Sequence, residues 1–496
     1  MDQSSKDSEV VNLGWRVTFA GMGINLALGV LYSWSVIKKA IPSEWGWDDA
    51  DKALPYSIAC IVFALVMVPA GRLQDKIGPR WVATAGGILT GLGCIVASFA
   101  TSVLWYVIGF GILAGAGIGL GYAATTPAAV KWFPARRTGL IAGLVVAGFG
   151  LASVYISPVA NYLTGNNLAG KPLPAVQLLI DTKSAADAEV KVAQEALAAA
   201  QADPSRAAEV AQVEQLVAEK STAAQTASAS VLALKEKSIK RTLMILGIGF
   251  LCVVTFLAQL LKVPHKVLQF TKKLGPSEQI TPAKPTKVDV APMAMLKKPQ
   301  FYLLWFMFAF SSGAGLMIIG SITTIAKLGH IEAGFVLVAL LAIGNASGRI
   351  AAGMLSDKIG RLWTMFIVFM FQAAMMMALR TGLSNMGIFV LVSMLLGFNY
   401  GACLSVFPSA MKDNFGLKNF GVNYGLVFTA WGVGGLVFPQ VAGRMFEAAK
   451  AATGTGSYNN AYLMAAALLC VAAALTFATR SAEKKNNAAM AAAAAE

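Results

Sequence analysis

The sequence predicts an all-α membrane protein with twelve transmembrane helices, arranged as two six-helix bundles with a helical insert outside the membrane. Three observations predict this class. Hydrophobic residues make up 56% of the 496 residues, and charged residues only 13%, against about 25% in a soluble domain. The apolar residues are gathered into long runs, and the mean hydropathy is +0.63. A helix needs about 20 such residues to cross a bilayer, and no soluble core accommodates a dozen of them.

The polar segments divide the chain into twelve predicted spans and a few larger connections. The first ten residues are polar and acidic, unlike a signal peptide, so we expect the first apolar run to be retained. We expect a first bundle from residues 1–163 and 241–262, an external insert at 164–240, a linker at 263–299 and a second bundle at 300–496. The predicted spans are 13–37, 53–71, 81–100, 103–128, 138–163, 241–262, 300–326, 332–355, 362–380, 386–411, 421–446 and 458–479.

The distribution of positive charge predicts the orientation. With twelve spans both termini lie on one side, and most Lys and Arg of the connections lie on that side too, above all in 263–299. The positive-inside rule therefore predicts both termini in the cytoplasm, the insert outside, and a plasma (inner) membrane location. The net charge of +15 follows from these loops and indicates a lipid bilayer rather than nucleic acid. The five cysteines are scattered through the apolar runs, so we expect no metal site and no cofactor.

One motif occurs twice, each time just after the second span of a half. It reads GRLQDKIGPR at 71–80 and GMLSDKIGR at 353–361. We expect the first glycine to allow a close helix approach, the Asp to accept from a helix start or an Arg, and the second glycine to form a tight turn. The residues concerned are Gly71, Asp75, Gly78, Arg80, Gly353, Asp357, Gly360 and Arg361. The motif resembles the loop motif of the major facilitator superfamily. The resemblance of the chain to this family covers all of it except the insert. The resemblance implies two bundles that rock about a site at the bilayer midplane.

The insert is rich in alanine and balanced in charge. Asp203, Pro204 and Ser205 form a helix-start signal, because Asp caps a helix and Pro fits its first turn. Val210, Val213, Leu216 and Val217 then recur at helical spacing. We expect two antiparallel helices packed on each other. A solvated spacer and a docking module for an external protein both fit this pattern.

Charges are nearly absent from the predicted spans. The 25 acidic residues all lie in loops, at span ends or in the insert, and of the 40 basic residues only Arg349 is clearly inside a span. A charge within a membrane costs roughly 2.5 kcal/mol or more and usually has a function. Arg349 either reaches to the cytoplasmic face or Asp357, or awaits an anionic substrate. The planar fork of a guanidinium suits a carboxylate, which favours a small organic anion.

Polar and aromatic residues in other spans accompany this arginine. Asn345 lies four residues earlier and shares a helix face with Arg349. The other candidates for a substrate site are Tyr32, Tyr122, Asn399, Tyr400 and Trp431, although single tyrosines in spans also serve as interfacial residues. The many glycines, as in residues 111–121, indicate helix-packing faces rather than phosphate loops.

Three further segments resemble the oxalate–formate antiporter family. These are KWFPARR at 131–137, PQFYLLW at 299–305 and the arginine of NASGR at 345–349. Bacterial lactate transporters related to the animal monocarboxylate carriers are similar and share the arginine. The resemblance implies a secondary transporter in which Arg349 binds the substrate carboxylate.

The sequence departs from these families at two positions. The oxalate antiporter has a second cation in span eleven where this chain has Trp431, and proton–lactate carriers have an Asp where this chain has Asn345. One cation suits a monocarboxylate such as lactate, pyruvate or formate, because a dicarboxylate would leave one charge unpaired. Asn345 cannot carry a proton, so symport with protons and exchange with a counter-anion both remain open. The alternatives are oxalate–formate exchange and, from another class, a membrane sensor without transport; an enzyme is the weakest alternative, since no catalytic set is evident.

Overall fold

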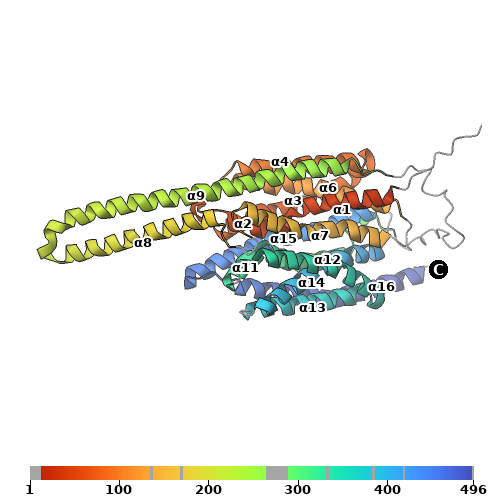
Figure 1. The fold of residues 1–496 in the computed structure, drawn as a ribbon. Coiled ribbons are helices and arrows are strands. Elements are labelled where there is room, and N and C mark those ends of the chain that lie inside the picture. Colours follow the sequence, from red (N-terminus) through yellow and green to blue (C-terminus); the bar gives the residue numbers. More distant parts are fainter. Residues whose placement is uncertain are drawn as a thin grey trace, which may run out of the picture.

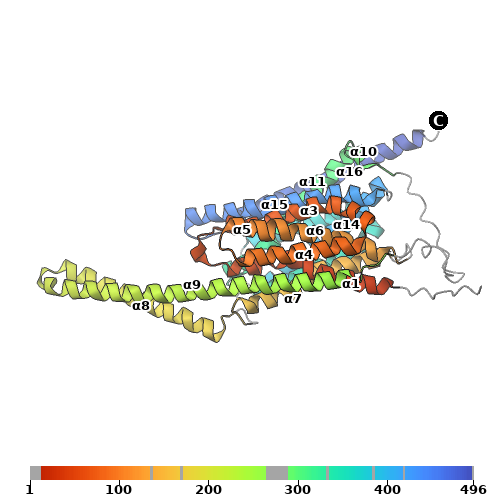
Figure 2. The ribbon, with the colours of Figure 1, turned by 90° about the horizontal axis from the view of Figure 1, so that it is seen from above.

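A computed structural model describes residues 13–133, 138–167, 171–263, 289–330, 334–381, 386–416 and 419–493. Within these residues, 12 helices are long and apolar enough to cross a membrane, which confirms the predicted fold class. They run side by side in one body, and a long helical hairpin projects from one end (Figures 1 and 2). The two ends of the body are called the hairpin end and the linker end below. The linker end is the end at which residues 263 and 289 lie, the last described residue before the linker and the first one after it.

The first half contains six spans, two of which are composite. The first combines α1 (Gly14–Leu28), η1 (Gly29–Ser33) and α2 (Trp34–Ala40). The fourth combines α5 (Val103–Tyr106), the π-helical η3 (Val107–Ala114) and α6 (Gly115–Val130). The others are α3 (Asp49–Ile77), α4 (Pro79–Ser98), α7 (Thr138–Leu163) and the last part of α9 (Ala207–Ala258).

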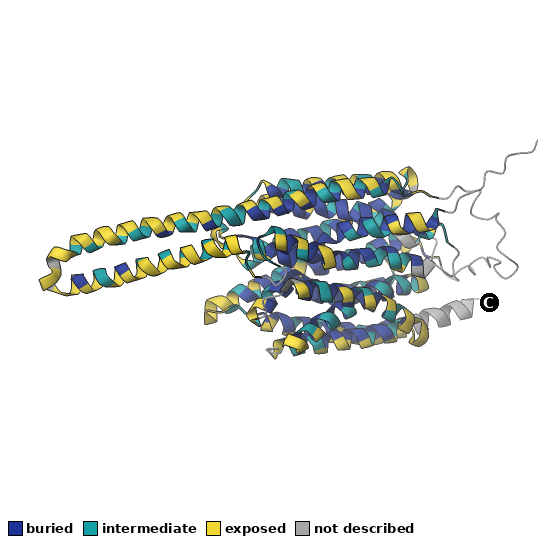
Figure 3. Cartoon of the chain, in the orientation of Figure 1, coloured by how far each residue is buried: buried dark blue, intermediate teal, exposed yellow. Residues whose placement is uncertain are grey.

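The second half follows the short helix α10 (Pro292–Met295) and has one helix per span. The core of both halves is buried, whereas the outward faces of the body and most of the hairpin are exposed (Figure 3). The spans are α11 (Pro299–Leu328), α12 (Gly334–Ile359), α13 (Arg361–Arg380), α14 (Met386–Phe415), α15 (Phe420–Thr453) and α16 (Asn459–Ala493).

The insert is a two-helix hairpin whose second helix continues into the membrane. Helix α8 (Pro174–Ala202) packs against α9, with Lys220 and Glu189 paired across them at 3.0 Å. Residue 240, expected as the end of the insert, lies inside the 52-residue helix α9. Hydropathy cannot locate this boundary, because a helix continues through a change of polarity when its backbone bonds persist.

The hairpin turn follows the predicted start signal. The carboxylate of Asp203 accepts from the backbone N–H and the hydroxyl of Ser205, and these bonds hold the pKa of the carboxyl below its ordinary value. The short helix η5 (Pro204–Arg206) then leads into α9. The prediction of the apolar stripe needs a correction: Leu216 is exposed, whereas Ala224 and Val231, which were not predicted, are buried.

Several helices extend beyond the predicted spans. The first span reaches Ala40 and so includes Lys38, which the sequence analysis left outside the membrane. The second begins at Asp49, because Asp48 and Asp51 form a reciprocal capping box at its N-terminus. These acidic residues lie at the helix end, as the sequence analysis expects for acidic residues of the spans.

The two halves meet along α3 with α15 and along α7 with α12. At the hairpin end they are joined by hydrogen bonds. Thr323 donates to the carbonyl of Ser35 at 2.7 Å, and Gln440 donates to the carbonyl of Ala50 at 3.2 Å. At the linker end a cavity of about 540 Å³ lies between α3 and α6 on one side and α10 and α15 on the other. The interface is thus closed at the hairpin end and hollow at the linker end.

Four glycines bring α12 and α14 into backbone contact. A Cβ at Gly344, Gly348, Gly397 or Gly401 would overlap a carbonyl oxygen of the facing helix. Small residues permit this approach, and in a membrane helix association depends on such packing. The contact fixes the rotation of α12 and therefore the direction of every side chain on it.

Substitution of Gly348 by alanine tests this contact. We expect Gly348→Ala to cost about 1–3 kcal/mol of stability, because the added methyl group must displace the backbone of Phe398. The thermal unfolding temperature of the purified protein measures the effect. Gly249→Ala is the control, since a Cβ there meets nothing within 4 Å. A Gly348→Ala protein that unfolds at the wild-type temperature would contradict this account.

Shortening the hairpin tests its independence from the body. We expect replacement of residues 179–230 by a short Gly/Ser turn to leave the unfolding temperature nearly unchanged. The deletion keeps the two attachments of α9 to the loop before α3, which are Lys235 with Glu44 at 3.4 Å and Glu236 with Trp45 at 2.8 Å. An aggregated or strongly destabilised product would show that the hairpin supports the body.

Candidate functional site

Arg349 lies on α12 at the contact between the halves. Its side chain is buried, with 7% of its surface exposed. Its Nε donates to Oδ1 of Asn345 at 3.0 Å, and its Nη1 donates to the backbone carbonyl of Val146 at 3.1 Å. Val146 belongs to α7 of the first half, so the guanidinium bridges the two halves. Among the described residues no carboxylate pairs with Arg349, and its hydrogen-bond partners, which also include the hydroxyl of Tyr122, are neutral.

This geometry settles one alternative from the sequence. Arg349 does not tie down Asp357, because the carboxylate of Asp357 is paired with Arg361 at 2.6 Å. A buried guanidinium is costly unless its N–H groups are bonded. Arg349 therefore sits where a charged acceptor would stabilise it more than its present neutral ones do.

Asn345 and Asn399 add buried amide groups near this level of the bundle. The Oδ1 of Asn345 faces the guanidinium, and its Nδ2 is buried without a hydrogen-bond partner among the described residues. Gly150 on α7 leaves room beside it, since a Cβ there would lie 3.6 Å from the amide carbon. Asn399 on α14 is also buried, with an Nδ2 that likewise has no partner in the described part of the chain. Among the described residues, no hydrogen bond joins Asn399 to Arg349. The structure therefore links Asn345 to the arginine, but not Asn399.

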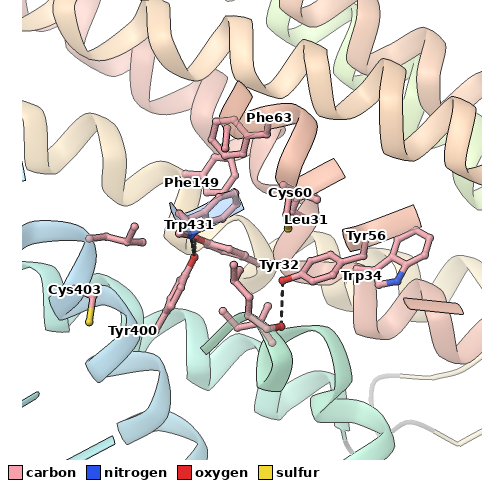
Figure 4. Close-up of a cluster of buried hydrophobic side chains, with 14 of the residues drawn as sticks. Leu31, Tyr32, Trp34, Tyr56, Cys60, Phe63, Phe149, Tyr400, Cys403 and Trp431 are labelled. Carbon is pink, nitrogen blue, oxygen red and sulfur yellow. Dashed lines mark hydrogen bonds between the residues drawn. The ribbon is translucent and has the colours of Figure 1, made fainter. Parts of the chain in front are cut away.

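Three other predicted residues form one hydrogen-bonded chain across the halves. The hydroxyls of Tyr32 and Tyr400 lie 2.8 Å apart, and Nε1 of Trp431 donates to the Tyr400 hydroxyl at 2.7 Å (Figure 4). Tyr32 comes from η1 of the first half, whereas Tyr400 and Trp431 come from α14 and α15 of the second. The indole of Trp431 is thus held by a hydrogen bond and is fully buried.

Aromatic rings line the space between these groups. Tyr122 packs edge-on against Phe63 and Phe149, both at 5.3 Å between ring centroids. Phe428 stacks on Trp431 at 5.1 Å. Arg349 interacts electrostatically with the hydroxyls of Tyr32 and Tyr122, and also with that of Tyr424. The surroundings of the arginine are therefore apolar rings with a few inward hydroxyls.

The sequence analysis missed a second buried cation. Lys38 is 3% exposed and pairs with Asp49 at 2.7 Å, at the hairpin end of the interface. The backbone N–H of Asp49 donates to the carboxylate of Glu447 on α15 at 3.1 Å, so this pair belongs to the closed end. Unlike Arg349, Lys38 has its counter-ion. The sequence signal was its place only a few residues after a long apolar run, which a longer first span would have included.

The repeated motif adopts the same turn in both halves. Gly78 and Gly360 both have φ of +90°, a region that favours glycine, and each turn leads directly into a helix. This confirms the predicted tight turns. Arg361 binds Asp357 and also Asp413, the latter at 3.0 Å, so Asp357 does accept from an arginine.

The two copies of the motif differ in their other contacts. Arg80 donates to Gln259 at 2.5 Å, and the side chain of Asp75 lies outside the described residues. A Cβ at Gly353 would lie 3.0 Å from Ser405, as expected for a close approach. A Cβ at Gly71 would meet no described atom within 4 Å, so the expected close approach is not made in this state.

Sequence reasoning could not find the Val146 carbonyl or the rings of Phe63, Phe149 and Phe428. A backbone carbonyl carries no sequence signal, and apolar rings are common in every span. Of the segments that resemble the antiporter family, residues 134–137 lie outside the described residues, as do linker residues 264–288.

Comparison with known families agrees with this architecture. The family profile described as Major Facilitator Superfamily matches residues 17–168, 240–439 and 306–495. The chain therefore belongs to the major facilitator superfamily, and it is a multi-pass membrane transporter. The matches leave out most of the hairpin.

Curated relatives cover most of the chain at low identity. An uncharacterized transporter of the superfamily, YhjX of Escherichia coli, is 25% identical over 85% of this chain and 86% of its own. The oxalate:formate antiporter of Oxalobacter formigenes is 25% identical over 81% of this chain and 77% of its own. Monocarboxylate transporter 13 of Rattus norvegicus is 32% identical over 31% of this chain and 36% of its own.

A solved structure shows the same fold. A bacterial homologue of the human lysosomal transporter Spinster, in an inward-facing and occupied conformation, matches with a TM-score of 0.62 and 13% identity. The match covers 95% of this chain and 98% of that one.

The hydroxyl chain gives a testable difference in stability. We expect Tyr400→Phe to destabilise the protein by about 1–3 kcal/mol, because it leaves the buried Trp431 N–H without its acceptor. Tyr32→Phe is the matched control, since it keeps the bond between Trp431 and Tyr400 and should cost less. Thermal unfolding of the three purified proteins measures both effects. Equal losses of stability in the two variants would contradict the assignment of Tyr400 as the acceptor of the Trp431 hydrogen bond.

Proposed function

We propose that the protein is a secondary transporter of small monocarboxylates, of the lactate, pyruvate or formate class, that works by alternating access. The observation that carries the proposal is the buried guanidinium of Arg349, which bridges the halves and is hydrogen-bonded among the described residues to neutral groups, which include an amide and a peptide carbonyl. A substrate carboxylate would accept two parallel hydrogen bonds from the guanidinium of Arg349 and would replace the Val146 carbonyl as acceptor. It would gain a charge-assisted pair of bonds in an apolar setting, where such bonds are strong.

The surroundings of Arg349 favour one negative charge over two. The rings of Phe63, Phe149 and Phe428 line the region, and Trp431 occupies the place where the antiporter family has a lysine. Lys38, the other buried cation described above, is already neutralised by Asp49. A second carboxylate would therefore lack a cation, at a cost on the order of several kcal/mol.

Alternating access follows from the two ends of the interface. The positive-inside distribution favours a cytoplasmic location for the linker end. The present state is then closed to the outside by the contacts of Thr323 and Gln440, and hollow toward the cytoplasm. Rocking of the halves would break these contacts, close the cavity at the linker end and expose Arg349 to the other side.

The names of the relatives support the substrate class. One relative is named as an oxalate:formate antiporter and another as a monocarboxylate transporter. Asn345 beside the arginine is neutral and cannot carry a proton, so any proton coupling would have to use another group. Oxalate–formate exchange is the second candidate, favoured by the relative that matches over most of its length.

Substitution of Arg349 tests the proposal directly. In proteoliposomes screened with short organic acids by counterflow, we expect Arg349→Gln to abolish uptake and Arg349→Lys to lose most of it. An ammonium cannot make two parallel bonds to a carboxylate. Arg380→Gln is the control, because Arg380 is exposed at the hairpin end of α13. Uptake by Arg349→Gln near the wild-type rate would remove the proposed site.

Charge at position 431 separates the two candidate substrates. We expect oxalate to compete with labelled monocarboxylate at least about a hundredfold more weakly than lactate or formate, as several kcal/mol of unpaired charge implies. Trp431→Lys should strengthen competition by oxalate, because it adds the second cation. Trp431→Met serves as the control for loss of the indole. Strong inhibition of the wild type by oxalate would favour the exchange function instead.

A further inference from the structure

We propose that Glu447 is the gate residue of the hairpin end, where its carboxylate caps the N-terminus of α3 across the interface and holds this end closed. Glu447 lies on α15 of the second half. Its Oε1 accepts from the backbone N–H of Asp49, the first residue of α3 in the first half, at 3.1 Å. This role rests on the proposed alternating access, but it does not depend on which substrate is carried.

The start of α3 takes one of its acceptors from the other half. The first N–H groups of an α-helix have no acceptor within the helix. Asp48 accepts from the N–H of Asp51, and the carboxylate of Asp51 accepts in return from the N–H of Asp48. The carboxylate of Asp49 itself is paired with Lys38 at 2.7 Å. The N–H of Asp49 is therefore capped by Glu447 rather than by its own neighbours.

One face of α15 packs on this helix start. Gln440, Gly443 and Glu447 recur at helical spacing, so they share a face of α15. The amide of Gln440 donates to the carbonyl of Ala50 at 3.2 Å. A Cβ at Gly443 would lie 3.0 Å from the Cα of Ala50, so α15 lies directly against the first turn of α3. This close packing fixes the place of the Glu447 carboxylate.

The charge of Glu447 strengthens the cap. A helix N-terminus carries a partial positive charge, which favours an anion there. Lys52, one turn into α3, also interacts electrostatically with Glu447. On the same helix as Glu447, Lys450 lies 3.8 Å from it and offsets part of its charge. A hydrogen bond to a carboxylate is stronger than one to a neutral acceptor, so an amide at this position would cap α3 less well.

The cap can exist only while the halves touch at the hairpin end. Lys38 and Asp49 belong to the same half, so their ion pair is kept when the halves separate. Asp49 and Glu447 belong to different halves, so their hydrogen bond is lost. A contact that is present in one state and absent in the other shifts the equilibrium between the two states. Glu447 therefore favours the state that is closed at the hairpin end.

The native thiol of Cys60 can report this equilibrium. Cys60 is buried where α3 packs on α15, and a Cβ at Gly435 would lie 3.0 Å from its sulfur. It lies about three turns into α3 from Asp49. Separation of the halves at the hairpin end would expose this thiol to a water-soluble maleimide. Cys94, which is buried at the contact of α4 with α9, is the internal reference.

Alkylation of the full-length protein in nanodiscs, without substrate, tests the proposal. Peptide mass spectrometry would measure the rate at which Cys60 is modified, which is proportional to the open fraction. We expect Glu447→Ala to raise this rate about fivefold, which corresponds to about 1 kcal/mol for a lost helix cap. Glu447→Gln keeps an uncharged acceptor and should give a rate between those of the wild type and Glu447→Ala. Glu195→Ala, on the exposed surface of the hairpin, should react as the wild type does.

Two outcomes would overturn the proposal. Modification of Cys60 at the wild-type rate in both Glu447 variants would show that the cap does not hold the gate. An equal rise at Cys94 would show that the substitution loosens the whole fold. The test is separate from that of the proposed function, because alkylation needs no substrate. Failure of every monocarboxylate in the uptake assay would remove the proposed function and leave the alkylation result standing.

Discussion

The arrangement of the site depends on the glycine contact between α12 and α14. Because a carbonyl of one helix lies where a Cβ of the other would be, neither helix can rotate without separating from its partner. That constraint turns Arg349 and Asn345 toward α7 and turns Tyr400 toward η1. A charged side chain inside a membrane bundle is tolerated only where its direction is fixed and its N–H groups are bonded. The glycines supply the fixed direction and the first half supplies an acceptor.

Because the acceptor belongs to the other half, the charge of Arg349 is also part of the contact that holds the halves together. The hydroxyls of Tyr32 and Tyr400 form a second polar link between the halves near the same level. At the hairpin end the links between the halves are more numerous and include the hydrogen bond from the backbone N–H of Asp49 to the carboxylate of Glu447. Under the proposed function, a ligand that binds the guanidinium would replace its contact with the Val146 carbonyl and leave the links at the hairpin end in place. Binding would then be a separate event from opening.

Much of the fold could be predicted because hydrocarbon imposes simple rules. Length and polarity alone give twelve spans, and the duplicated motif gives the two halves and the turns at Gly78 and Gly360. Arg349 could be found because a lone charge in an apolar run is rare. The prediction failed where tertiary contacts override polarity, as at Lys38, whose charge is buried only because Asp49 lies beside it. It also failed where the partner is a backbone atom, as with Val146, or where a helix continues past a change of polarity, as in α9.

The continuity of α9 has a mechanical consequence. From Ala207 to the membrane near Lys240 the helix is unbroken, which at 1.5 Å per residue is a rod of about 50 Å. The rod is an extension of a span of the first half and is attached again at Glu44 and Trp45. Its tip therefore acts as a lever arm: a tilt of the first half by about 10° carries the tip through roughly 9 Å for that length of helix. Any structure on the hairpin side must leave that arc free. An obstacle at the tip would oppose the tilt with a torque equal to its force multiplied by the length of the arm.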